Sequence, residues 1–160
     1  MPEPWFDVMQ VCLNGHKTAE GLKTWPQHGK QFCSNCGAAT ISKCQNCQKD
    51  IPGFYHAPFN IADAVVPVFC QSCGKPYPWT ESKLKAAQEL AQEVEGLSDS
   101  ERDALKASLD DLVRDTPRTG LAATRFKRLV AKSGKGTAEA FKTILIDVLV
   151  ETAKRVIFPT

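Results

Sequence analysis

All seven cysteines of this 160-residue chain lie between positions 12 and 73, and their spacing limits how this region can fold. Three Cys-x-x-Cys pairs are preceded by a cysteine that has a histidine four positions after it. A Cys-x-x-Cys turn presents two sulfurs to one ion, and Zn²⁺ takes four nitrogen or sulfur ligands in a tetrahedron. The spacing predicts two structural Zn²⁺ ions, held by eight side chains: Cys12, His16, Cys33, Cys36, Cys44, Cys47, Cys70 and Cys73.

Glycines support this interpretation, because the residue after such a turn adopts a left-handed backbone that glycine accepts without strain. Gly37 and Gly74 stand directly after the second cysteine of their pairs, and Gly15 directly before His16. Gln48 occupies the same place after Cys47, so the third turn departs from the pattern.

Other uses of the cysteines fit the pattern less well. A redox motif needs a Cys-x-x-Cys that opens a helix after a strand, whereas these pairs lie among short extended segments and turns. Iron in the all-thiolate second site stays an alternative. His28 and His56 are expected to be surface or packing residues, because eight ligands already complete two tetrahedra.

Redox compartment is a further constraint. The odd number of cysteines and a start, MPEPWFDVMQ, without a basic, apolar leader argue against secreted disulfides. We therefore expect a cytoplasmic protein with reduced thiols.

The four pairs can be joined in three ways. Sequential pairing joins the first with the second and the third with the fourth. Interleaved pairing, as in RING fingers, joins first with third, and nested pairing makes FCSNCGAATISKCQNC its own cage. Residues 37–43 separate the second and third pairs, which is room for a short strand. This spacing favours sequential pairing into two tandem zinc ribbons, with a RING-like module as the alternative.

The segments VCLNGH, FCSNCGA, KCQNCQ and FCQSCGKPY resemble the tandem double-zinc-ribbon proteins of bacteria and archaea. More closely, the chain is similar to a functionally uncharacterised bacterial family that combines an MPEPW-like start, these turns, a PWTE junction and a helical tail. The resemblance implies two structural zinc ions, a cytosolic protein and no catalytic residues. His16 stands where the common pattern has a cysteine.

Composition changes near Thr80, after which the chain is rich in Ala, Leu, Lys and Glu with helical periodicity. We expect a small metal-bound β domain at 1–79, the tandem double zinc ribbon, and an all-α helical bundle at 80–160. In the first domain, most aromatic side chains are expected to serve as core.

Four helices are expected in the second domain. Thr80 caps the first, Ser98 and Glu101 form a capping box for the second, the third runs over 120–133, and Thr137 caps a fourth that continues to Pro159. The expected inward faces are Leu84, Ala87, Ala91 and Val94, then Leu105, Leu109, Leu112 and Val113, then Ala122, Phe126, Leu129 and Val130. The fourth helix is apolar on more than one side. Its neighbours enclose it, or it mediates self-association or docking of a protein partner.

Basic residues gather on the third helix, where Arg125, Arg128 and Lys132 share one face. This stripe either lies beside the acidic preceding helices or forms a docking surface for nucleic acid or an acidic protein.

Catalysis finds little support in the sequence. Both predicted zinc sites have four protein ligands, which leaves no open position for substrate, and no catalytic motif is present. The longest apolar run, ILIDVLV, is far shorter than the roughly 20 residues of a membrane span. We expect a non-catalytic adaptor that presents Trp5, Trp25, Phe54, Tyr55 and Trp79. Nucleic-acid binding is the weaker alternative, since the first domain is nearly charge-balanced.

Overall fold

The chain forms two compact units, Met1–Glu81 and Ser82–Thr160, in a computed structural model that describes residues 2–159. The boundary lies two residues beyond the one expected from composition, within the first helix. Each unit is described separately below.

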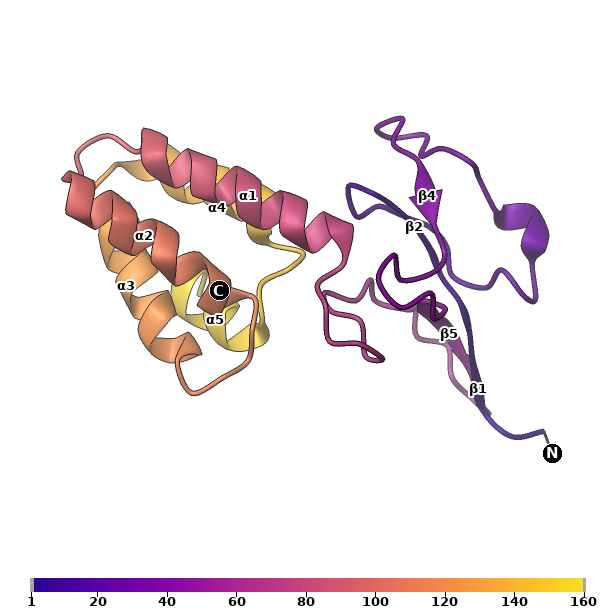
Figure 1. Ribbon diagram of the computed structural model, residues 1–160. Coiled ribbons are helices and arrows are strands. Elements are labelled where there is room, and N and C mark those ends of the chain that lie inside the picture. The colour runs from indigo at the N-terminus through magenta and orange to yellow at the C-terminus, as the bar shows by residue number, and fades with distance from the viewer. Residues whose placement is uncertain (1, 160) are drawn as a thin grey trace. The chain divides into compact units, whose positions relative to one another are not determined.

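The N-terminal unit contains two small antiparallel sheets (Figure 1). In the first, β1 (Trp5–Val8) pairs with β5 (Pro52–His56). The second has the order β3-β2-β4, from β3 (Lys17–Ala19), β2 (Gln10–Cys12) and β4 (Thr40–Ile41). A short 3₁₀ helix covers Pro26–His28. Strands of two to five residues bury little surface, so turns and side-chain clusters must hold much of this unit together.

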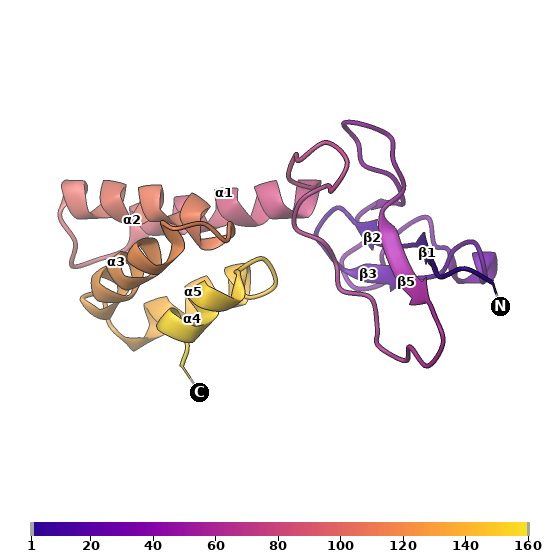
Figure 2. The same cartoon turned by 90° about the horizontal axis from the view of Figure 1, so that it is seen from below.

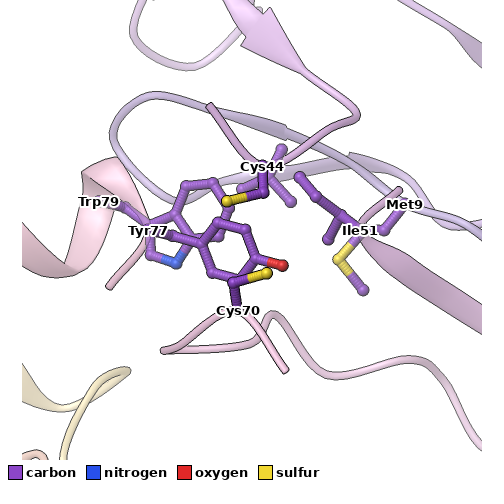
Figure 3. Packing of buried hydrophobic residues seen from close by; sticks show 7 residues of the cluster. Met9, Cys44, Ile51, Cys70, Tyr77 and Trp79 are labelled. Atoms are coloured by element: carbon purple, nitrogen blue, oxygen red, sulfur yellow. The ribbon is translucent and has the colours of Figure 1, made fainter. Parts of the chain in front are cut away.

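The core of this unit surrounds the third and fourth cysteine pairs. Tyr77 and Trp79 are fully buried, and their rings stack with centroids 4.7 Å apart. Figure 3 shows these rings beside the sulfur atoms of Cys44 and Cys70. The indole Nε1 of Trp79 donates a hydrogen bond to the Pro67 carbonyl oxygen at 2.8 Å. The buried members of the cluster are Met9, Val11, Cys44, Ile51, Cys70, Tyr77 and Trp79.

Most other aromatic side chains of this unit lie at its surface, which corrects the expectation that they form core. Phe6 is 56% exposed, and Trp5, Trp25 and Tyr55 are each about 40% exposed. Trp79, expected at the surface, is buried instead. Cys44 and Cys70 belong to the buried core, and among the aromatic rings described in this unit only Tyr77 and Trp79 are enclosed with them.

The C-terminal unit contains five helices where four were expected. In it, α3 packs against α2, α4 and α5 (Figures 1 and 2). The predicted inward faces of the first three helices are buried apart from Leu84, which is half-buried. The bounds are α1 Pro78–Glu93, α2 Asp99–Leu112, α3 Thr119–Ala131, α4 Lys135–Leu145 and α5 Glu151–Ile157.

Helix starts agree with the sequence in one case and differ in two. The capping box of Ser98 and Glu101 is confirmed. Thr80 is not the cap of α1, which begins at Pro78, a residue preset for the first helical turn; the Thr80 hydroxyl instead donates to the Val68 carbonyl oxygen at 2.8 Å. Thr137 is not a cap either, because α4 begins at Lys135 after Gly134.

The expected single fourth helix is wrong, because residues 146–150 interrupt it. The backbone N–H of Val150 donates to the Leu112 carbonyl oxygen at 3.1 Å, which fixes the turn against the end of α2. A straight helix could not turn apolar side chains on several sides toward one core. The break lets α4 and α5 each turn a different apolar side inward. Residues from both helices and the turn become buried: Phe141, Leu145, Val148, Leu149, Ala153 and Ile157.

No helix in residues 2–159 combines the length and the apolar character that crossing a membrane requires.

A buried carboxylate joins three segments of the N-terminal unit. The Asp7 side chain is fully buried and accepts hydrogen bonds from the backbone N–H groups of Val8 and Lys23 at 2.7 and 2.8 Å. Its other oxygen accepts from the Thr24 hydroxyl at 2.6 Å and lies 2.8 Å from Nε2 of His56. Burial alone would raise the pKa of Asp7, but these hydrogen bonds outweigh it and hold that pKa well below its ordinary value.

We expect Asp7→Asn to destabilise this unit by about 1–3 kcal/mol, because an amide cannot accept all these hydrogen bonds. Urea unfolding of the metal-loaded protein measures the cost. Asp50→Asn is the matched control; its carboxylate contacts only the exposed Lys23 and Lys43, so its cost should stay within about 1 kcal/mol. Equal costs for both variants would show that the Asp7 contacts contribute nothing special.

The pH dependence follows from the lowered pKa. Stability from ionised Asp7 is fully present above its unfolded pKa, about 3.9, and is lost as the pH falls below that value. The cost of Asp7→Asn, measured by urea unfolding, should therefore stay constant between about pH 8 and 5. A cost that shrinks within this window would contradict the assignment.

Candidate metal centres

The first cluster gathers Cys12, His16, Cys33 and Cys36. Cys12 ends β2, His16 follows in the turn before β3, and the other two lie in one tight turn. The Sγ atom of Cys12 lies 3.7 Å from Sγ of Cys36 and 3.4 Å from Nδ1 of His16. The Sγ atom of Cys33 lies 3.6 Å from the same nitrogen.

The second cluster gathers Cys44, Cys47, Cys70 and Cys73. The Sγ atoms of Cys44 and Cys73 are 3.7 Å apart, as are those of Cys47 and Cys70. In every pair, the first cysteine is buried and the second partner lies nearer the surface. The third and fourth turns therefore face each other across one centre.

These separations match a tetrahedral metal site. With metal–sulfur bonds of about 2.3 Å and metal–nitrogen bonds of about 2.0–2.1 Å, tetrahedral geometry places two sulfurs about 3.8 Å apart and sulfur and nitrogen about 3.6 Å apart. The observed 3.4–3.7 Å fit both values. A disulfide requires about 2.05 Å between sulfurs. The donor sets therefore fit a metal ion and not a disulfide.

Backbone geometry builds the three Cys-x-x-Cys turns alike. In each, the first cysteine's carbonyl accepts from the N–H four residues later, at 2.8–2.9 Å, and its own N–H donates to the carbonyl five residues later, at 2.8 Å. The residue after the second cysteine has a positive φ of 74° at Gly37, 64° at Gln48 and 76° at Gly74. Gln48 thus adopts the conformation that the other two turns assign to glycine.

Hydrogen bonds to sulfur favour thiolates in both clusters. The backbone N–H of Ala38 and the Asn14 side chain, whose Nδ2 lies 3.3 Å from Sγ, lower the pKa of Cys36 to about 6. Burial raises the pKa of Cys70, but the N–H groups of Ser72 and Cys73 and the neighbouring thiols lower it to about 6.

Not every thiol can ionise without a cation. The backbone N–H of Lys49 lowers the pKa of Cys47, but burial and the adjacent thiols outweigh it and raise the value to about 11. Burial and the charge of Cys70 raise the pKa of Tyr77 as well. Four thiolates in one cluster thus need a nearby positive charge, which a bound metal ion supplies.

The structure brings all eight predicted ligands together, and their grouping is the sequential one. Neither the interleaved nor the nested arrangement occurs. None of the cysteine turns opens a helix, as a redox motif would require. His28 and His56 lie outside both clusters: His28 is exposed near Trp25, and His56 pairs with Asp7.

Asn14 and Tyr77 are two neighbours of the clusters that sequence reasoning missed. Asn14 contacts Cys36 across 22 positions, and Tyr77 packs on the second cluster. The only signals were the asparagine inside VCLNGH and the tyrosine that follows FCQSCGK.

The predicted basic stripe is exposed on one side of α3 and at its end, but its members differ in their contacts. Lys132 forms an ion pair with Glu101 of α2. Arg125 and Arg128 instead line a groove between α2 and α3, together with Arg118.

Backbone strain at Gln48 yields a first prediction for these centres. Gln48→Gly should stabilise the unit by about 1 kcal/mol, and Gly74→Ala should destabilise it by about 1–2 kcal/mol, because a left-handed backbone costs a side-chain-bearing residue roughly that much. Space is not the reason, since a Cβ at Gly74 would meet no atom within 4 Å. Chelator titration and urea unfolding measure both effects.

Gly120→Ala provides the control, because this glycine lies in α3 without a positive φ and in open space. It should stabilise the helical unit. Gly74→Ala that behaves like Gly120→Ala would show that the turn tolerates a side chain.

Ligand removal tests whether the two clusters are independent. Cys33→Ser should lose one bound metal ion and retain the second, because its cluster shares no ligand with the other. Cys44→Ser should lose the other ion and also expose Trp79, because Cys44 belongs to the buried core. Elemental analysis and tryptophan fluorescence measure the two effects. Loss of both ions from Cys33→Ser would contradict independence.

Comparison with known proteins identifies the family of this chain. No curated protein and no solved structure matches this chain. The sequence model of a family described as "Uncharacterized protein conserved in bacteria (DUF2321)" matches residues 5–157, a range that includes all eight ligands and parts of both units. This agrees with the resemblance to an uncharacterised bacterial family. The chain therefore belongs to this bacterial family, DUF2321.

Proposed function

We propose that this protein is a non-catalytic, cytoplasmic adaptor built on two tandem zinc ribbons, each with one structural Zn²⁺ ion. The observation that carries the proposal is the donor geometry: two sets of four protein donors, each at tetrahedral separations. Three thiolates with one imidazole, and four thiolates, are donor sets typical of structural zinc. Reduced thiols in both clusters suit a reducing compartment.

A structural role follows from the number of ligands. Zinc that activates water or substrate keeps one position open, whereas these clusters supply all four ligands from the chain. Metal binding would then contribute folding free energy to a unit whose strands are short. The zinc ions would fix the surface of the unit and take no part in a reaction.

That surface carries exposed rings on both faces of the β1–β5 pair. On one face, Trp5 stacks on His56 with centroids 4.3 Å apart, and Trp25 lies 6.0 Å from the same histidine. On the other face, Phe6 contacts Tyr55 at 4.6 Å. We call Trp5, Phe6, Trp25 and Tyr55 the aromatic surface. Exposed rings of this kind mark protein interfaces, where tryptophan and tyrosine contribute much of the binding energy.

Nucleic-acid binding is the second candidate, because exposed rings can also stack on bases. Its electrostatic support is weak. Residues 1–81 contain six lysines and no arginine against six acidic residues, which gives no net charge. Affinity for nucleic acid depends largely on cations that neutralise phosphates. A protein partner therefore suits the aromatic surface better.

The helical unit is assigned to docking of a protein partner and not to self-association. Among the apolar side chains that prompted the idea of self-association, five are buried, five are half-buried and none is exposed. The buried ones are Phe141, Leu145, Val148, Leu149 and Ile157, and the half-buried ones are Ile144, Ile146, Val150, Val156 and Phe158.

The test uses the full chain purified from native cells after cross-linking. We expect two zinc ions per chain and a co-purified protein partner that is lost, at least about tenfold, in Phe6→Ser/Tyr55→Ser. Lys43→Ser/Lys49→Ser, which removes two exposed lysines from the same unit, should retain both partner and zinc. Fewer than two zinc ions, or nuclease-sensitive capture of nucleic acid, would contradict the proposal.

A further inference from the structure

The groove between α2 and α3 combines small side chains with arginines. It encloses about 190 Å³. Ala104 and Ala107 of α2 and Ala122 of α3 form its small-residue lining, and Arg118, Arg125 and Arg128 border it. Alanines let another helix approach closely, because short side chains permit short interaxial distances.

Two of the three arginines have no counterion among residues 2–159. Arg118 donates to an Asp111 carboxylate oxygen at 3.2 Å. No ion pair or hydrogen bond of the Arg125 or Arg128 side chain occurs within residues 2–159. Nearby Lys132, by contrast, is paired with Glu101. The groove therefore keeps a net positive charge and two guanidinium groups that can bind carboxylates in a bidentate manner.

An exposed leucine lies among these cations. Leu121 also lines the groove and is 51% exposed, the one large apolar side chain of residues 82–159 with such exposure. Arg118, Leu121, Arg125 and Arg128 follow one another at helical spacing, so they share one face of α3 over about 15 Å. The face thus places one apolar side chain between positively charged ones.

We infer that this groove binds an acidic amphipathic helix of a partner protein. One apolar side chain of that helix packs on Leu121 and the alanines, and its carboxylates face Arg125 and Arg128. Nucleic acid suits the groove less well, since phosphates would neutralise the arginines but leave Leu121 and the alanine lining without an apolar partner. This inference names the partner class for the docking role proposed above and rests on that proposal.

The test measures binding of fluorescein-labelled 16-residue peptides to the full zinc-loaded chain by fluorescence anisotropy. A panel of helical peptides places one leucine between glutamates at different spacings, and a matched panel carries lysine in place of glutamate. We expect at least one acidic peptide to bind, with affinity that falls as salt rises, and no lysine peptide to bind.

Variants then locate the site. Arg125→Glu/Arg128→Glu should weaken binding at least about tenfold, and Leu121→Ser at least about fivefold. Lys106→Glu/Lys127→Glu makes the same charge change at exposed lysines of α2 and α3 that do not line the groove, and should change affinity less than twofold. Circular dichroism verifies that each variant is folded.

Three outcomes would overturn the inference: no acidic peptide binds at low salt, both charge reversals weaken binding equally, or duplex DNA binds more tightly with the same dependence on Arg125 and Arg128. Zinc content, measured on the same samples, separates this test from the proposed function. Groove variants that keep two zinc ions but lose no peptide affinity contradict only the groove. A chain without zinc that still binds peptide contradicts only the structural zinc sites.

Discussion

The N-terminal unit depends on one constraint: four donor side chains must meet at a single centre, and they do so at two separate centres. Its strands span only two to five residues, and only two of its aromatic rings are fully buried. Strands this short bury little apolar surface, and small units with a limited core commonly gain stability from a structural metal. The sulfurs of Cys44 and Cys70 are themselves part of the core, packed with Tyr77 and Trp79. Ligand geometry and core packing therefore depend on each other in this unit. A substitution of a ligand disturbs the core, and a substitution in the core disturbs the ligands.

Ligand spacing made the clusters predictable, because a Cys-x-x-Cys turn has few ways to place its sulfurs. The seven residues between the second and third pairs indicate the sequential grouping from the sequence alone. Helical periodicity likewise identified the buried faces of α2 and α3. An apolar stripe such as Leu105, Leu109 and Leu112 lies on one side of a helix, and that side packs against the core. Both features are local, so the spacing of residues in the sequence is enough to predict their geometry.

Features that depend on distant residues were not predictable. The break between α4 and α5 requires Val150 to meet the end of α2, 38 positions earlier, and no local pattern in 146–150 shows that contact. Asp7 sits in the strand WFDV, yet its role arises from Lys23, Thr24 and His56, which only the fold assembles. The aromatic residues were misassigned for a related reason: burial of a ring depends on how much interior the sulfur clusters leave, and that volume is not visible in the sequence.

The two units differ in the chemistry that they offer to other molecules. The N-terminal unit has no net charge and displays stacked rings, a surface that gains affinity from apolar and aromatic contact. The C-terminal unit displays arginines around a small-residue groove, a surface whose guanidinium groups are complementary to carboxylates. Because electrostatic complementarity governs partner choice more than total affinity, one acidic helix would suit the groove and gain nothing from the rings. We therefore propose that the two surfaces bind two different partners. The proposed adaptor would hold one partner through aromatic contact and another through charge, a role that needs no reactive centre.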